Sequence, residues 1–355
     1  MRFFAFLWLQ RVLRRLRKEL PAFAAAWAGV LVVTVSLASA AAREKITVYT
    51  ALENEQIRPL LADFQTQNPG VEVEVVRDSN GVIAARLLAE ADNPRADVVW
   101  QVAATTLMML AGRELLEPYA PAGLSSIRPR FRDAAEPPRW VAGNAWMTAF
   151  ACNTVELRRR GLPVPKSYAD LADPRYRGLI TMPHPGSSGT GFMLVSGILQ
   201  TMGESEGWAY LDALHRNVLR YEHSGSRPAK QAAAGECAIG ISFCYASLQA
   251  RERGAPIEVV FPAEGSGWEM EASALVRKRE IAPAARRFLD WATGRSAVTE
   301  YGRSYGVLSR EDVRSDRAGY PADVDAQMAP NDLSWAASHR DRILEEWNRR
   351  YGSGK

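Results

Sequence analysis

Cysteine and histidine are scarce in this sequence, with three cysteines and four histidines among 355 residues. An odd number of cysteines in a long chain excludes a small scaffold held together by disulfides. Cys152, Cys237 and Cys244 form no C-x-x-C pair, and the histidines are scattered along the chain. The sequence therefore contains no recognisable metal-binding motif. We expect three buried free thiols, no bound metal and no cofactor.

Long apolar segments are equally rare. Residues 22–40 (AFAAAWAGVLVVTVSLASA) form the one uncharged run that is long enough to span a bilayer. The run follows the positively charged block Arg11–Lys18 and ends in Ala38-Ser39-Ala40, which is the pattern of a secretory signal peptide. We predict a signal peptide over residues 1–42 and a periplasmic mature protein. An uncleaved membrane anchor is the alternative that the sequence leaves open.

The positive net charge of +4 is confined to this leader. Residues 1–40 carry six cationic side chains and one anionic side chain. Residues 41–355 therefore hold 38 basic and 39 acidic residues, which is a net charge of −1. No basic domain remains that would bind nucleic acid through its overall charge.

Short apolar strands alternate with helical stretches along the rest of the chain. Residues 45–52 (KITVYTAL) alternate as a strand, and residues 55–69 follow with apolar side chains at helical spacing. Such alternation predicts βαβ units around a mostly parallel sheet. We expect further strands at 71–78, 96–100, 146–153, 178–183, 238–245, 257–262 and 270–276, and further helices at 82–94, 191–202, 206–215, 228–235, 283–293 and near the C-terminus.

The segment ITMPHPGSSGTGF (180–192) is typical of an anion site. A strand ends at Pro183, a Gly/Ser/Thr loop follows, and a helix begins near Gly191. Backbone N–H groups, hydroxyl groups and the positive end of a helix dipole bind an anion without any lysine. The spacing matches neither a nucleotide-binding phosphate loop nor a nucleophile elbow, so we expect no enzyme and no catalytic residue. Simple capping of the helix by serine is the alternative explanation.

Three other loops follow strands in the same way. They contain Glu53, the Ser79-Asn80-Gly81 turn, and the run His223–Pro228. Ligands of open α/β sheets bind beyond the carboxyl ends of the strands, where such loops meet. For any one of these loops, helix capping explains the residues as well as ligand binding does.

Several motifs resemble one protein family. They are Tyr49-Thr50-Ala51-Leu52-Glu53, Arg77-Asp78-Ser79, Asp92-Asn93-Pro94, Ala96-Asp97-Val98-Val99-Trp100, Ser187-Ser188-Gly189-Thr190-Gly191-Phe192, His223-Ser224-Gly225-Ser226 and Gln231–Glu236. Over residues 45–350 the chain resembles periplasmic substrate-binding proteins of ABC transporters. Within that family it is most similar to the 2-aminoethylphosphonate-binding branch, which is related to ferric-iron-binding proteins.

The resemblance implies the two-lobed α/β fold of type II periplasmic binding proteins. Each lobe would be a mostly parallel sheet flanked by helices, with the ligand cleft between the lobes. Lobe one would comprise residues 43–146 and 270–315, and lobe two residues 147–269 and 316–350. The protein would be a monomer that delivers a phosphonate to an ABC transporter permease at the inner membrane.

The resemblance also implies a set of binding residues. Serine and threonine hydroxyls would hold the phosphonate, and Glu53 or Glu271 would pair with an ammonium group of the ligand. Ferric iron is the alternative ligand, but iron-binding relatives carry two adjacent tyrosines where this chain has Cys244-Tyr245. The expected ligand-binding residues are Ala51, Glu53, Ser79, Ser187, Ser188, Gly189, Thr190, Ser224, Gly225, Ser226, Tyr245 and Glu271.

Overall fold

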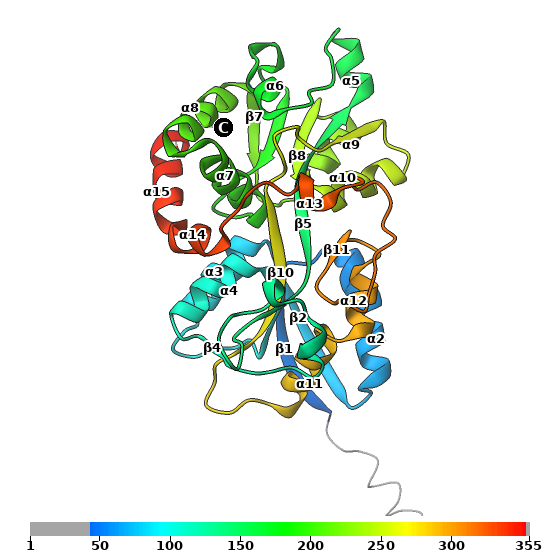
Figure 1. Cartoon of the computed structure of the whole chain (residues 1–355), viewed down its shortest axis with the longest axis vertical. Helices are drawn as coiled ribbons and strands as arrows, with labels where there is room; N and C mark the ends of the chain where they lie inside the picture. Colours follow the sequence, from blue (N-terminus) through cyan, green and yellow to red (C-terminus); the bar gives the residue numbers. More distant parts are fainter. Residues whose placement is uncertain (1–42, 353–355) are drawn as a thin grey trace, which may run out of the picture. The chain divides into compact units, whose positions relative to one another are not determined.

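The first of two groups of strands comes mainly from the N-terminal part of the chain (Figure 1). The computed structural model describes residues 43–352. β1 (Glu44–Thr50) pairs in parallel with β3 (Val98–Ala103), and β2 (Val71–Arg77) lies on the other side of β1. β10 (Trp268–Val276) is antiparallel to β3, so it brings a distant segment into this group. We call this side of the molecule lobe one.

The second group contains three parallel strands. β6 (Ile180–Pro183) pairs with both β7 (Val218–Glu222) and β8 (Ile239–Phe243). β9 (Ile257–Val260) pairs with β5 beside them. We call this side lobe two, and the strand order from end to end is β2-β1-β3-β10-β5-β8-β6-β7.

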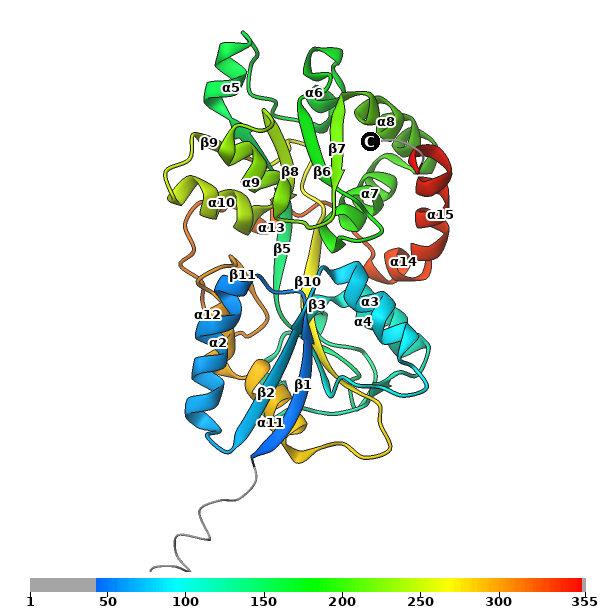
Figure 2. The same ribbon diagram turned by 180° about the vertical axis from the view of Figure 1, so that it is seen from behind.

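β5 (Val141–Asn153) belongs to both lobes. Its first half pairs with β10, and residues 148–153 pair with β8 and β9. All thirteen of its residues are buried, which agrees with its nearly continuous apolar sequence. β5 and β10 therefore run from one lobe into the other, as Figure 2 shows. The predicted two-lobed α/β architecture is confirmed.

Helices cover both sides of the strands in each lobe (Figures 1 and 2). In lobe one they are α2 (Asn54–Gln67), α3 (Asn80–Ala89), α4 (Ala104–Gly112), α11 (Pro283–Ala292) and α12 (Arg295–Tyr301). In lobe two they are α5 (Thr154–Arg159), α6 (Tyr168–Ala172), α7 (Gly189–Met202), α8 (Glu204–Asn217), α9 (Arg227–Ala234) and α10 (Cys244–Glu252). Short elements complete the chain: β4 (Leu116–Glu117), β11 (Val307–Leu308), α13 (Val324–Gln327) and three 3-10 turns at Leu124–Ser126, Pro129–Phe131 and Pro174–Tyr176.

The hydrophobic core of lobe one has a cluster of aromatic side chains at its centre. In lobe one, Phe64, Trp100, Phe288 and Trp291 pack with ring centroids 4.8–5.7 Å apart. Such tilted and edge-on pairs stabilise a core beyond the burial of their area. Trp100 is fully buried there. The rigid core of lobe one therefore supports the ends of β1 and β3.

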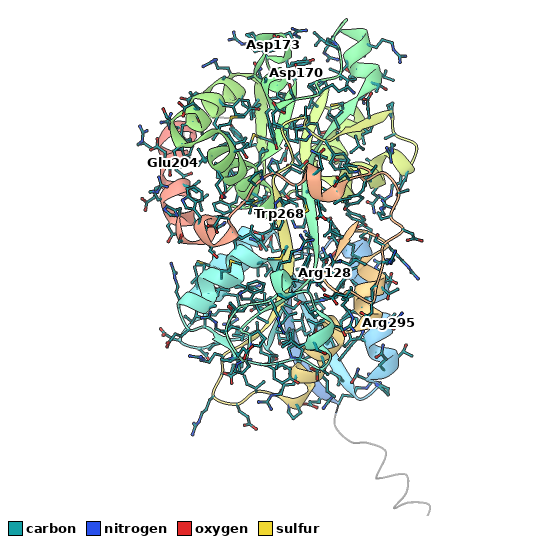
Figure 3. All side chains as sticks on the ribbon, viewed as in Figure 1. Arg128, Asp170, Asp173, Glu204, Trp268 and Arg295 are labelled. Atoms are coloured by element: carbon teal, nitrogen blue, oxygen red, sulfur yellow. The ribbon has the colours of Figure 1, made fainter. Side chains whose placement is uncertain are left out.

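The C-terminal helices α14 (Leu333–Ser338) and α15 (Arg340–Tyr351) connect the two lobes on one side. The apolar stripe of α15, which includes Ile343 and Trp347, is buried in the core of lobe two. Arg342 forms an ion pair of 2.6 Å with Glu204 at the start of α8; Figure 3 labels Glu204. α14 packs against α4 of lobe one. The helix predicted near the C-terminus is confirmed.

The structure corrects several sequence predictions. The strand predicted at 238–245 ends at Phe243, because Cys244 begins the helix α10, whose apolar side packs on β5 and β9. The strand predicted from residue 146 begins at Val141, and the helix predicted to reach Pro94 ends at Ala89. α4 was not predicted, since its sequence ATTLMMLAG has neither a capping residue nor a polar face.

The predicted signal peptide, residues 1–42, lies outside the described residues. Within residues 43–352, no helix has the length and apolar character needed to cross a membrane. The boundaries predicted for the two lobes stay a prediction.

Candidate functional site

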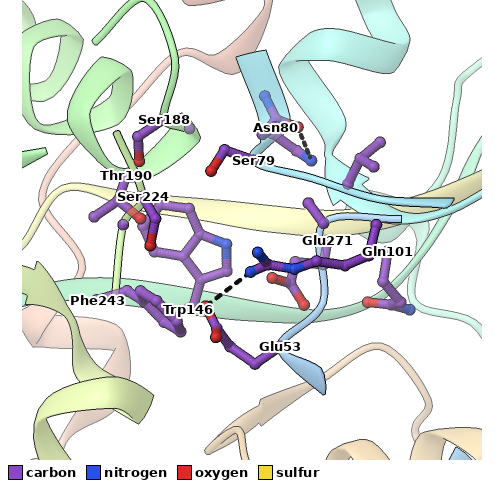
Figure 4. A pocket seen from close by; sticks show the side chains of 16 residues that line it. Glu53, Ser79, Asn80, Gln101, Trp146, Ser188, Thr190, Ser224, Phe243 and Glu271 are labelled. Atoms are coloured by element: carbon purple, nitrogen blue, oxygen red, sulfur yellow. Dashed lines mark hydrogen bonds and ion pairs between the residues drawn. The ribbon is translucent and has the colours of Figure 1, made fainter. Parts of the chain in front are cut away.

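A polar pocket lies between the lobes, at the ends of strands from both (Figure 4). It encloses about 500 Å³ of space between atoms, its open mouth included. The space within it that the centre of a water molecule can reach is about 60 Å³, so the pocket is narrow in this structure. Its wall is formed by Ala51, Glu53, Arg77, Ser79, Asn80, Gln101, Val102, Ala103, Trp146, Ser188, Gly189, Thr190, Ser224, Gly225, Phe243 and Glu271.

The lobe two wall is built from hydroxyls and the N-terminus of α7. Ser188 is the N-cap, and its Oγ accepts a hydrogen bond of 3.4 Å from the N–H of Gly191. Gly189 and Thr190 form the first turn, where the backbone N–H groups have no partner within the helix. Ser224 reaches the same wall from the loop after β7. This end of the pocket is suited to an anion.

The lobe one wall includes a second helix N-terminus. Ser79 is the N-cap of α3, and Asn80 is its first residue. The Asn80 side chain is held in place because its Nδ2 donates to Thr106 Oγ1 over 2.9 Å and its Oδ1 accepts from the Ala103 N–H over 3.0 Å. The positive ends of α3 and α7 therefore both face the pocket from opposite lobes.

Three charged side chains form a cluster at one corner of the pocket. Glu53 Oε1 lies 3.1 Å from Arg77, and Glu53 Oε2 lies 3.2 Å from Lys230 of lobe two. The Glu53 carboxylate, whose side chain is 13% exposed, is thus paired with two cations. These two cations reduce the capacity of the Glu53 carboxylate to attract the ammonium group of a ligand. Arg77 adds a cation to a site that was predicted without one.

Glu271 is a different kind of carboxyl group. It lies on β10 opposite Asn144, whose Nδ2 donates to Glu271 Oε2 over 3.4 Å. Burial raises the pKa of Glu271 to about 7, and the nearby Glu269 and Glu53 carboxylates act in the same direction. Among the described residues no lysine, arginine or histidine forms an ion pair with it. Glu271 is therefore the pocket carboxyl that lacks a counter-charge.

Trp146 and Phe243 supply the apolar part of the wall. Their ring centroids lie 6.0 Å apart in an edge-on arrangement. Figure 4 shows Trp146 between the hydroxyl end, with Ser188, Thr190 and Ser224, and the end that holds Glu271. The pocket thus has two polar ends and an apolar middle.

Nine of the twelve expected ligand-binding residues line this pocket: Ala51, Glu53, Ser79, Ser188, Gly189, Thr190, Ser224, Gly225 and Glu271. The other three lie outside its wall. Ser187 Oγ donates to the His223 carbonyl, Ser226 Oγ lies 3.1 Å from Ser224 Oγ, and the Tyr245 hydroxyl accepts from Gln249 over 2.7 Å. Ligand contact by any of the twelve stays a prediction.

Seven wall residues were missed: Arg77, Asn80, Gln101, Val102, Ala103, Trp146 and Phe243. The signal for Gln101, Val102 and Ala103 was present, since they directly follow the strand predicted at 96–100 and ligands bind beyond strand ends. Trp146 carries no such signal, because it lies inside a strand.

Within residues 43–352, no group of three or more His, Cys, Asp or Glu side chains could hold a metal ion. All three cysteines are free and buried, as predicted. Burial raises the pKa of the Cys237 and Cys244 thiols, which makes them poor nucleophiles.

Comparisons with known proteins agree with this architecture. Residues 93–335 match the model of a family described as bacterial extracellular solute-binding protein. A protein of Haemophilus influenzae is 29% identical over 320 residues, which is 87% of this chain and 91% of that protein. A putative 2-aminoethylphosphonate-binding periplasmic protein of Salmonella typhimurium is 24% identical over 268 residues, 73% of this chain and 76% of the relative.

Solved structures of periplasmic binding proteins share the fold. The protein AfuA from Actinobacillus pleuropneumoniae, with fructose-6-phosphate bound, aligns with a TM-score of 0.80 and 25% identity over 88% of this chain and 100% of its own. Iron-bound HitA from Pseudomonas aeruginosa aligns with a TM-score of 0.71 and 18% identity over 85% of this chain and 99% of its own. The predicted fold of a two-lobed periplasmic binding protein is confirmed.

Proposed function

The chain belongs to the family of bacterial extracellular solute-binding proteins, and we propose that it captures 2-aminoethylphosphonate, or a similar organic phosphonate, for an ABC transporter permease. Proteins of this family bind a ligand and release it unchanged, so the proposed role is transport and not catalysis. A periplasmic location, reached through the predicted signal peptide, is part of the proposal.

The observation that carries the proposal is the pair of helix N-termini facing one another across the pocket. The N-terminal turns of α3 and α7 present Ser79, Ser188 and Thr190 to the same space. A phosphonate is a compact anion with three acceptor oxygens, which such N–H and hydroxyl donors satisfy. Helix dipoles from two lobes attract the anion only when the lobes are close together. Ligand binding would therefore favour the closed arrangement.

The carboxyl group of Glu271 is our choice for the ligand ammonium. Glu53 already has Arg77 and Lys230 as partners, whereas Glu271 has a raised pKa and no cation beside it. An ammonium group next to Glu271 would stabilise its ionised form and would itself be paired inside the protein. This pair would distinguish the aminophosphonate from inorganic phosphate, which has no amine.

Two other ligands deserve direct comparison. The similarity to AfuA supports a phosphate ester such as fructose 6-phosphate, which would use the same anion end. Ferric iron is supported only by the fold shared with iron-binding proteins such as HitA. The hydroxyl and N–H donors of the pocket wall favour an anion over a cation, and Tyr245 does not line the wall.

A ligand panel tests the proposal. Thermal unfolding of the mature protein would be followed with 2-aminoethylphosphonate, ethylphosphonate, fructose 6-phosphate, inorganic phosphate or ferric ion. A ligand at a hundred times its dissociation constant stabilises the folded state by about 2.7 kcal/mol. We expect the largest shift with 2-aminoethylphosphonate, confirmed by calorimetric titration. A larger shift with fructose 6-phosphate or iron, and none with either phosphonate, would overturn the proposal.

A further inference from the structure

Gln101 has an unusual backbone conformation at the end of β3. Its φ angle is +50°, a left-handed conformation that residues other than glycine seldom adopt. The register of β3 against β10 passes from Val102 opposite Ala272 to Val99 opposite Ala274. Two residues of β3, Trp100 and Gln101, therefore oppose Ser273 alone. Gln101 sits in a β-bulge, a feature that redirects a side chain and is frequent beside functional sites.

The Gln101 side chain is buried without a partner. It lines the pocket, its residue is 0% exposed, and within residues 43–352 neither its Oε1 nor its Nε2 makes a hydrogen bond. Tyr301 lies close enough for the Gln101 amide to counter part of the rise that burial causes in its pKa. The Tyr301 hydroxyl, however, already accepts from Trp100 Nε1 over 2.8 Å and donates to the Ala292 carbonyl over 3.1 Å. A buried amide with both atoms unsatisfied destabilises a protein, so it requires an explanation.

The neighbouring strand makes room for this amide. β5 contains its own register shift, with Glu271 opposite Asn144 and Ala272 opposite Ala142, which leaves Gly143 as the extra residue. A Cβ at Gly143 would lie 2.4 Å from Gln101 Nε2 and 2.6 Å from the Tyr301 ring. Both strands that flank β10 are therefore irregular at the level of Gln101. The irregularities leave room for the fully buried Gln101 side chain beside Gly143 and the Tyr301 ring.

Gln101 and Glu271 lie at the same end of the pocket. In Figure 4 both are on the side away from Ser188, Thr190 and Ser224. Glu271 lies opposite Ala103 in the β3–β10 pairing, two residues beyond Gln101. The end of the pocket that is remote from the anion donors thus contains a carboxyl group that has Asn144 and Tyr305 as hydrogen-bond partners but no counter-charge, together with the Gln101 amide.

We propose that Gln101 determines ligand specificity by hydrogen bonding to the polar group that the ligand carries at the end remote from its phosphonate. The inference depends on the proposed function and extends it to the substrate class, which is a phosphonate with a hydrogen-bond donor about two carbons away. The Gln101 Oε1 accepts from that donor beside Glu271. The cost of the strained backbone and of the buried amide is offset when the ligand is bound.

The test compares two probes that differ only in the amine, 2-aminoethylphosphonate and ethylphosphonate. Calorimetric titrations would use the wild type, Gln101→Leu, Gln101→Gly, and Gln67→Leu as a control at an exposed glutamine of α2. Losing a hydrogen bond to a charged group costs roughly tenfold to a hundredfold in affinity. We expect Gln101→Leu to lose about that factor for 2-aminoethylphosphonate and less than about threefold for ethylphosphonate.

Stability without ligand provides a second measurement. Gln101→Gly relieves the backbone strain of the left-handed conformation and removes the unsatisfied amide, so the variant should unfold at a temperature no lower than that of the wild type. Clear destabilisation by Gln101→Gly would show that the residue serves folding, and the inference would be wrong. Equal preference for the amine in the wild type and in Gln101→Leu would also overturn it, while the proposed function would stand. Binding of neither probe to the wild type would instead overturn the proposed function itself.

Discussion

The backbone N–H of Gly81 in α3 donates a hydrogen bond of 2.9 Å to the carbonyl oxygen of Ser187, in the loop before α7. This bond joins lobe one to lobe two at the edge of the pocket. Two further contacts cross the same boundary: an ion pair of 3.2 Å between Glu53 and Lys230, and a hydrogen bond of 3.3 Å between His223 Nε2 and Asp78 Oδ1. The structure therefore has its lobes closed around the pocket.

Substitution of Gly81 should prevent this closure. A Cβ at Gly81 would lie 2.2 Å from the Gly186 carbonyl oxygen and 2.8 Å from the Ser187 carbonyl oxygen, and both are backbone atoms. We expect Gly81→Ala to weaken phosphonate binding by about tenfold or more, because the clash penalises only the closed state. Calorimetry and small-angle scattering with saturating ligand would show the lower affinity and a more extended molecule.

The matched control is Gly112→Ala at the exposed end of α4. A Cβ there meets no atom within 4 Å. Alanine should stabilise that helix by about 0.5–1 kcal/mol and leave ligand affinity unchanged. If Gly81→Ala also bound with wild-type affinity, closure would not require the Gly81–Ser187 contact.

Glu271 should make amine recognition dependent on pH. Its pKa of about 7 means that the carboxyl group is largely protonated at pH 5.5 and must lose its proton to pair with an ammonium. As the pH is raised toward 7, the preference for 2-aminoethylphosphonate over ethylphosphonate should therefore increase by up to ~tenfold per pH unit. Above pH 7 the preference should level off. The phosphonate group titrates at a lower pH when an ammonium group lies beside it, so the ratio is compared between the wild type and Glu271→Gln at each pH. Glu271→Gln should abolish the rise, and an unchanged profile in that variant would count against Glu271 as the amine partner.

The same carboxyl groups should affect stability without ligand. Burial raises the pKa of both Glu269 and Glu271 from 4.5 to about 7. The folded protein therefore holds more protons than the unfolded chain between about pH 4.5 and 7, and stability is lost as the pH rises through that window. Calorimetric unfolding of Glu269→Gln and Glu271→Gln should show a smaller decline from pH 5 to pH 7.5. A decline as steep as in the wild type would contradict the raised pKa values.

Glu53 and Glu271 should give opposite results when their charge is removed. Glu53→Gln would leave the Arg77 and Lys230 cations uncompensated near the pocket, so both phosphonates should bind more tightly. Glu271→Gln should instead weaken only the aminophosphonate. Titrations of both variants with both probes, at low and at high salt, would separate the two roles. A selective loss of the aminophosphonate in Glu53→Gln would return the amine site to Glu53.

Ser188 should contribute to binding as well as to stability. As the N-cap of α7 it satisfies the Gly191 N–H, so Ser188→Ala should cost about 0.5–2 kcal/mol of folding stability. It also removes a pocket hydroxyl and should weaken both phosphonates equally. Ser167→Ala is the matched control, because Ser167 caps α6 outside the pocket with a 3.0 Å bond to the Asp170 N–H. If both variants bound ligand like the wild type, Ser188 would be a cap and nothing more.

Local sequence patterns determined the class of fold and the position of the site. Short apolar stretches alternate along the chain with stretches whose apolar residues have helical spacing. This order predicted parallel strands with helices between them. Loops after the strands carried Glu53, Ser79, Ser188 and Ser224, and all four side chains line one pocket. The prediction succeeded within each lobe because the carboxyl ends of parallel strands meet at one edge of a sheet, whereas the tertiary structure makes the two edges face one another.

The charge state and the fine geometry of the pocket depended on the tertiary structure alone. Glu53 is neutralised by Lys230, 177 residues later in the sequence. The bulge at Gln101 exists because β3 pairs with β10, whose Ser273 lies 172 residues away. Ion pairing, desolvation and strand register are set by distances between remote segments, so no local pattern in the sequence reveals them.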